Sequence, residues 1–80
     1  MVMAMKTYAM EYVIIRKEEG FWKIEGEDIN GNKINKNYSA LSFGLPEIEV
    51  KRSGNLWGVY LKDKEGMPHR IFIARKVILE

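Results

Sequence analysis

Glycine-containing turn sequences divide this chain at near-regular intervals, and this regularity is the feature that most constrains its fold. The turns lie at residues 18–20, 30–32, 44–46, 53–55 and 64–68. Intervals of about 8 to 14 residues are typical of antiparallel sheets, sandwiches and barrels, in which short strands follow one another directly. The sharpest signal is Asn30-Gly31, for which we expect a two-residue type I′ turn with positive φ at both residues.

Between the turns, apolar side chains alternate with polar ones, which is the period of a strand with one buried face. Trp22 and Ile24 alternate with charged residues, and so do Ile48 and Val50. In residues 8–15 both faces are largely apolar. This first strand is therefore predicted to be central in the sheet or covered on both faces.

The last predicted strand covers residues 70–79. The alternation places Ile71 and Ile73 on its buried face and Phe72 on its outward face. Arg75 falls among the apolar positions, which indicates a β-bulge or a side chain that reaches outward at a rim. Residues 38–45 are the only segment with spacing close to that of a helix, and both a short helical turn and a loop fit them.

Eighty residues without cysteine allow one core and no disulfide or thiolate metal site. A sheet of several short strands in so small a chain must curl or close to cover its apolar face and its edges. We predict an all-β fold, a small antiparallel barrel of five or six strands, SH3-like or OB-like, over residues 6–80, after a flexible tail at residues 1–5. Both halves read strand, glycine turn, strand, which we attribute to general hairpin patterning.

The composition narrows the cellular context. No apolar run approaches the roughly 20 residues that span a bilayer, so we expect no membrane association and a cytoplasmic location. Glutamine is absent while Lys, Glu and Ile are abundant, a drift typical of proteins selected for high temperature. Five methionines argue the other way, but the balance favours a thermophilic, archaeal source.

The residues available for catalysis are few. His69 is the only histidine, and there is neither a cysteine nucleophile nor a recognisable catalytic motif, so we predict no enzyme activity and no cofactor. Asp28, Asn30 and Asn32 have the spacing of the first ligands in a calcium-binding loop, but Lys33 stands where that loop requires glycine. We interpret this segment as a hairpin turn and predict no metal site.

The charge of the chain is unevenly distributed. Residues 1–49 contain six basic and eight acidic residues, whereas residues 50–80 contain seven basic and three acidic ones. If the last two strands pair across the turn at residues 64–68, ammonium and guanidinium groups lie beside aromatic rings on one outward face, as in proteins that bind single-stranded nucleic acids. We predict DNA or RNA binding with little sequence specificity through Lys51, Arg52, Tyr60, Lys62, Arg70, Phe72 and Lys76.

A protein-contact or assembly module, including a homodimer through an edge strand, fits the same sequence. Half-exposed aromatic rings stabilise small sheets, and lysines on edge strands deter aggregation. Nucleic-acid binding requires the basic side chains of the last strands to converge beside an exposed aromatic ring. A protein-contact module requires an unpaired strand edge or an apolar patch. The candidates for such a patch are Met3, Met5, Tyr8 and Met10.

Overall fold

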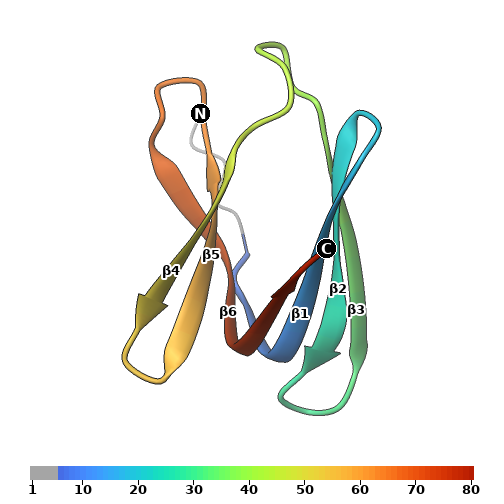
Figure 1. The fold of residues 1–80 in the computed structure, drawn as a ribbon, viewed down its shortest axis with the longest axis vertical. Helices are drawn as coiled ribbons and strands as arrows, with labels where there is room; N and C mark the ends of the chain where they lie inside the picture. The colour runs from blue at the N-terminus through green and yellow to red at the C-terminus, as the bar shows by residue number, and fades with distance from the viewer. Residues whose placement is uncertain (1–5) are drawn as a thin grey trace.

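The computed structural model describes residues 6–80 and shows one six-stranded sheet (Figure 1). The strands are β1 (Tyr8–Glu18), β2 (Phe21–Asp28), β3 (Lys33–Ser39), β4 (Ile48–Ser53), β5 (Leu56–Lys62) and β6 (Pro68–Leu79). Residues 6–80 contain no helix, and hence none that could cross a membrane. The all-β prediction is confirmed. The tail predicted at residues 1–5, with Met3 and Met5, lies outside the described residues.

The order of strands across the sheet is β3-β2-β1-β6-β5-β4. Neighbouring strands are antiparallel except at the centre, where β1 and β6 run parallel, from Tyr8 opposite Phe72 to Ile15 opposite Leu79. The prediction of a wholly antiparallel sheet is therefore wrong at this pair. The contact joins the first strand of one three-stranded meander to the last strand of the next, and no local turn encodes it.

The sheet curls so that two walls face each other (Figure 1). One wall holds β4, β5 and the first half of β6, and the other holds β1, β2 and β3 with the second half of β6. Within residues 6–80 no ladder joins β3 to β4, so the sheet keeps two edges. The segment between them contains no helical turn, because Leu41 and Gly44 form an isolated bridge instead.

The core lies between the two walls and consists of side chains that point inward. A register shift between β5 and β6 leaves Ile71 without a partner, so that Ile71 and Phe72 are both buried. The prediction that Phe72 faces outward is therefore wrong, because the bulge reverses the alternation at that point. The fully buried apolar residues are Met10, Val13, Ile15, Ile24, Val59, Leu61, Ile71, Phe72 and Ala74.

The turn between β2 and β3 is organised by a carboxylate. Oδ1 of Asp28 accepts hydrogen bonds from the amides of Asn30 and Asn32, both at 2.9 Å. Gly31 has a φ of 83°, whereas no residue other than glycine has positive φ among residues 6–80. The type I′ prediction is therefore wrong, because the aspartate stabilises a longer turn in which only Gly31 is left-handed.

The turn between β5 and β6 repeats this arrangement 35 residues later. Oδ1 of Asp63 accepts from the amides of Glu65 and Met67 at 2.9 Å, and Gly66 also has a φ of 83°. Residues 13–31 align with residues 48–66 without a gap. Each copy forms the same meander of three strands. The pairs identical between the copies are Trp22 and Trp57, Asp28 and Asp63, and Gly31 and Gly66.

The repeat extends to a side-chain contact that general hairpin patterning does not require. Lys17 places its ammonium 5.7 Å from the centre of the Trp22 ring. At the equivalent positions, the guanidinium of Arg52 lies 5.3 Å from the Trp57 ring. The two halves of the chain thus share one structural unit, and we call this correspondence the internal repeat.

We predict that Phe72→Ala lowers the free energy of unfolding by about 3–5 kcal/mol, because a fully buried ring leaves a cavity in the core. Urea denaturation followed by tryptophan fluorescence measures the change. Tyr60→Ala, on the outer face of β5, serves as the matched control and is expected to cost much less. Equal losses for the two variants would contradict the assignment of Phe72 to the core, and Phe72→Leu replaces Phe72→Ala if the latter does not fold.

We also predict a dependence of stability on acidity at the two aspartate turns. The amide of Asn32 lowers the pKa of Asp28, and His69, followed by the amide of Met67, lowers the pKa of Asp63, both from 3.8. Because each folded pKa lies below the unfolded one, the stabilisation is present above about pH 4 and is lost as the pH falls further. Thermal melts of Asp28→Asn and Asp63→Asn should show a weaker acid dependence than wild type, since asparagine keeps the Oδ1 acceptor without the charge. Melting temperatures that fall in parallel would refute this.

Candidate functional site

The structure brings together four of the seven residues predicted to bind nucleic acid. Tyr60 on β5 pairs with Arg70 on β6, and Lys62 follows on the same outer face. Lys51 on β4 reaches this face and lies 5.8 Å from the centre of the Tyr60 ring. The pairing across the turn at residues 64–68 is therefore as the sequence predicted.

Two glutamates neutralise the lysines of this face. The Nζ atom of Lys62 lies 3.0 Å from a carboxylate oxygen of Glu49 and 3.6 Å from one of Glu47. The Nζ atom of Lys51 lies 2.8 Å from Glu49. Hydrogen bonds from Lys51 and Lys62 lower the pKa of Glu49, which keeps it ionised. A phosphate group would have to displace these carboxylates, and only Arg70 adds a cation to the group.

The remaining three predicted residues lie elsewhere. Phe72 is fully buried and cannot stack on a base. Arg52 lies on the inner face, where its guanidinium is over the Trp57 ring and its Nε donates to the carbonyl of Gly54 at 3.1 Å. Lys76 pairs with Tyr12 of β1, beyond the bend of β6. The sequence does not show the register of β4 or the bulge of β6, so it predicts neither the two glutamates nor the positions of Arg52, Phe72 and Lys76.

The free edge of β3 is polar. The amide of Ala40 donates to the carbonyl of Gly20 at 3.1 Å. Every second residue before Ala40 therefore directs its amide and carbonyl toward β2. The amides and carbonyls of the intervening residues face the open side. Lys36 points inward, with its ammonium 5.1 Å from the ring of Tyr8. Inward lysines and polar edge residues discourage strand addition, and those at the open side are Lys33, Asn35, Asn37 and Ser39.

The free edge of β4 has the opposite character. The amide of Lys62 donates to the carbonyl of Glu47 at 2.9 Å, so the main-chain groups of Glu47 point toward β5. Main-chain direction alternates along a strand. The amides and carbonyls of Ile48, Val50 and Arg52 therefore point to the open side. The side chains of Ile48 and Val50 point inward and are only partly buried. Among residues 6–80, those whose main-chain groups have no strand partner at this edge thus also offer apolar side chains, at Ile48 and Val50.

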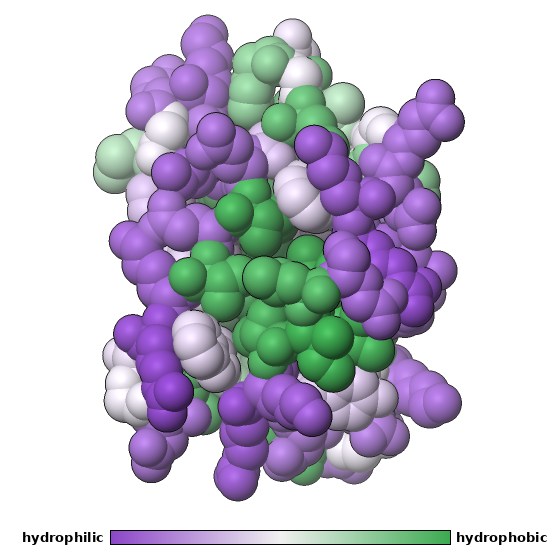
Figure 2. All heavy atoms as spheres, in the orientation of Figure 1, coloured by the Kyte–Doolittle hydropathy of each residue, from purple (hydrophilic) through white to green (hydrophobic). Residues whose placement is uncertain are grey.

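A hollow of about 490 Å³ adjoins this edge, and we call it the β4 groove. The ring of Trp22 is held at its side by a hydrogen bond of 2.7 Å from Nε1 to the carbonyl of Pro46. Leu79 is 69% exposed beside it. Figure 2 shows an apolar patch in the middle of one face, where Figure 1 places β4 and the end of β6, with hydrophilic residues around it. The groove is lined by Ile15, Lys17, Trp22, Ile48, Val50, Leu79 and Glu80.

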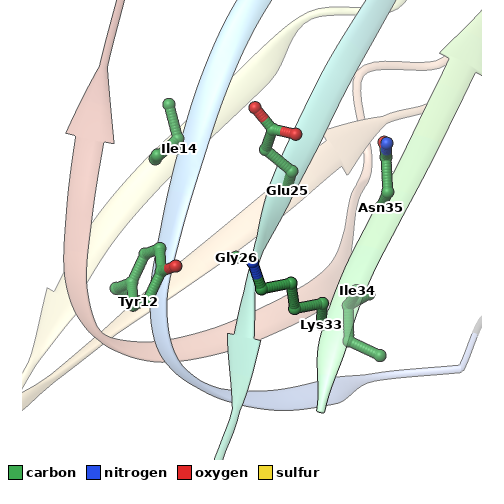
Figure 3. A pocket seen from close by; sticks show the side chains of 7 residues that line it. All are labelled: Tyr12, Ile14, Glu25, Gly26, Lys33, Ile34 and Asn35. Atoms are coloured by element: carbon green, nitrogen blue, oxygen red, sulfur yellow. The ribbon is translucent and has the colours of Figure 1, made fainter. Parts of the chain in front are cut away.

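A second hollow, of about 310 Å³, lies over β1, β2 and β3 (Figure 3). Its side chains spread along the three strands and do not point to a common centre. Glu25 is bound to Arg16, with 3.5 Å between the charged atoms. A Cβ atom on Gly26 would overlap the carbonyl of Tyr12, so this glycine serves the close approach of two strands. The hollow therefore reflects strand packing, and we assign no ligand to it.

The described residues, 6–80, form no cluster of three or more His, Asp or Glu side chains that could hold a metal ion. His69 lies 2.8 Å from Asp63 in an exposed turn. No protein-family model, no curated protein and no solved structure matches this chain. The β4 groove, with its free edge, is the candidate site that the geometry favours.

We predict that Trp22→Phe costs about 0.5–1.5 kcal/mol more than Trp57→Phe, because only the former removes a hydrogen bond seen in residues 6–80. Both rings are partly buried, but only Trp22 packs against the core, so the difference reports the bond to Pro46 together with that packing. Chemical denaturation followed by circular dichroism measures both values. If the two variants lose the same free energy, the bond does not hold the side of the groove.

Proposed function

We propose that this protein is a non-catalytic interaction module that receives an extended segment of a partner protein along the free edge of β4. One observation carries the proposal: at Ile48 and Val50, unpaired main-chain groups coincide with apolar side chains that line the groove. Strand addition uses both features, because main-chain hydrogen bonds provide affinity and pockets for alternate side chains provide specificity. The edge of β3 lacks the apolar half of this combination.

The groove has the size and lining that such a segment needs. Its volume lies within the range of about 300–1,000 Å³ typical of ligand sites. Every second side chain of an added strand would lie on the same face as Ile48 and Val50, and so would enter the groove. There it would cover the exposed Leu79 and the ring of Trp22, removing apolar surface from water.

We further propose that the sheet is an incompletely closed barrel of the SH3-like or OB-like kind. Its two free edges, β3 and β4, flank the open side. A strand added to β4 extends the sheet toward β3 and narrows that opening. Partner binding would then complete the cover that so small a sheet needs for its apolar face.

Nucleic-acid binding at the outer face of β5 and β6 is the competing hypothesis. Arg70 beside Tyr60 supports it. The ion pairs of Lys51 and Lys62 with glutamates weigh against it, since they cancel the charge that phosphates would seek. The test below therefore includes both kinds of ligand.

In an NMR titration of the ¹⁵N-labelled chain with extended peptides that carry apolar residues at alternate positions, we expect amide shifts at Ile48, Val50 and Arg52. Val50→Lys, which places a charge in the groove, should weaken binding at least tenfold, and a cooperative thermal melt shows that the variant is still folded. Lys51→Ala, on the same strand but the outer face, is the matched control and should bind apolar peptides as wild type does.

The contrary result is equally clear. Single-stranded DNA or RNA could bind with an affinity that falls steeply as salt rises, shifting the amides of Tyr60, Lys62 and Arg70 and leaving the edge of β4 unchanged. That outcome would replace the present proposal with nucleic-acid binding. Arg70→Ala should then abolish the interaction, and Val50→Lys should not.

A further inference from the structure

The internal repeat shows how an edge equivalent to that of β4 is covered by a strand, at β1. Val13 and Ile15 of β1 are the repeat equivalents of Ile48 and Val50 of β4. On β1, the edge that faces away from β2 is covered by the end of β6, with Val13 opposite Val77 and Ile15 opposite Leu79 in a parallel pair. Within residues 6–80 the equivalent edge of β4 has no partner strand.

The contacts of the covered edge define what it recognises. The side chains of Val77 and Leu79 occupy alternate positions opposite the apolar residues of β1. The amide of Glu80 donates to the carbonyl of Ile15 at 2.9 Å. The carboxylate of Glu80 accepts a hydrogen bond from Nε of Arg16. The template is therefore two apolar residues at alternate positions, followed directly by an acidic one.

The free edge of β4 offers the same groups. The carbonyl of Val50 stands in the place of that of Ile15 and faces the open side. Lys51 stands in the place of Arg16. Its side chain is 60% exposed, with Glu49 as its one ion-pair partner in residues 6–80. A carboxylate on an added strand can reach Lys51 as Glu80 reaches Arg16.

The chain's own equivalent segment cannot fill this place. Because of the bulge at Ile71, Tyr38 in the first copy corresponds to Ala74 in the second, so Leu41 and Phe43 stand in the places of Val77 and Leu79. This segment leads directly into β4, and a strand parallel to its neighbour needs a longer crossover connection. It turns on itself instead. Leu41 and Gly44 exchange hydrogen bonds of 2.9 Å, and Gly44 has a φ of 103°. Within residues 6–80 the edge of β4 is open because the segment that would cover it forms this tight turn directly before β4.

We propose that the β4 groove binds an extended segment that runs parallel to β4 and carries the pattern apolar, any residue, apolar, acidic. The apolar side chains lie opposite Ile48 and Val50, and the acidic one pairs with Lys51. This inference rests on the proposed function and gives it an orientation and a partner chemistry. The segment belongs to another protein, because the matching end of β6 is already held by β1 of its own chain.

The probe is a synthetic peptide with the sequence of residues 74–80, Ala-Arg-Lys-Val-Ile-Leu-Glu, titrated into the ¹⁵N-labelled full chain. We expect shifts at the amides of β4 and not at β1. Replacing both groove-facing residues of the peptide, Val77→Ser and Leu79→Ser, should weaken binding more than tenfold. Glu80→Lys in the peptide should weaken it about two- to fivefold, the range of an exposed ion pair. Lys51→Glu in the protein should reverse that preference.

Orientation is tested with a nitroxide label on either end of the same peptide. A parallel strand brings a label at the peptide's N-terminus close to the amide of Ile48, and one at its C-terminus close to that of Arg52. The reverse pattern of signal broadening would overturn the parallel arrangement.

The outcomes separate this inference from the function it rests on. Peptides that bind the groove without regard to the acidic residue or to direction refute the inference and leave the proposed function standing. If no peptide shifts the edge of β4, both fail. Self-association of the protein alone that rises with concentration and disappears in Val50→Lys would assign the groove to a second copy, and would overturn the assignment to another protein.

Discussion

The parallel contact between β1 and β6 holds the two halves of this protein together. Each half is a three-stranded meander that is too small to cover its own apolar face. The contact places Phe72 against Tyr8, with ring centres 5.7 Å apart, and against Tyr38 across the interior at 6.4 Å. Because the first strand of one unit meets the last strand of the other, β3 and β4 are left as the two edges.

The connection between the two copies explains why the sheet is open. In the register of the two meanders, Leu41 and Phe43 correspond to Val77 and Leu79, which cover the edge of β1. They lie directly before β4, however, and a strand that runs parallel to its neighbour needs a longer crossover connection. An edge left unpaired beside a half-buried apolar surface is a hazard for a soluble protein unless something binds it. The arrangement therefore favours a binding function for this edge.

Ion pairs formed in the fold neutralise part of the positive charge that the sequence concentrates in its second half. The excess of basic residues in the second half suggested a phosphate-binding face. Glu47 and Glu49, which belong by sequence to the acidic half, are carried by β4 into contact with Lys51 and Lys62. The outer face is consequently a salt-bridged surface, and we therefore place the proposed site at the free edge beside it.

The sequence by itself determined the class of the fold and the positions of its turns, because strand alternation and glycine turns are local properties that depend only on neighbouring residues. It also contained the repeat of 35 residues, visible in Trp22 and Trp57 and in the two aspartate turns. Only the tertiary structure decided the parallel pairing of β1 with β6, the bulge that buries Phe72 and the ion pairs of Glu49. These depend on register between strands far apart in the chain, and a shift of one residue exchanges the inner and outer faces. For the same reason, the free edge of β4 could be found only once every other strand had its partner.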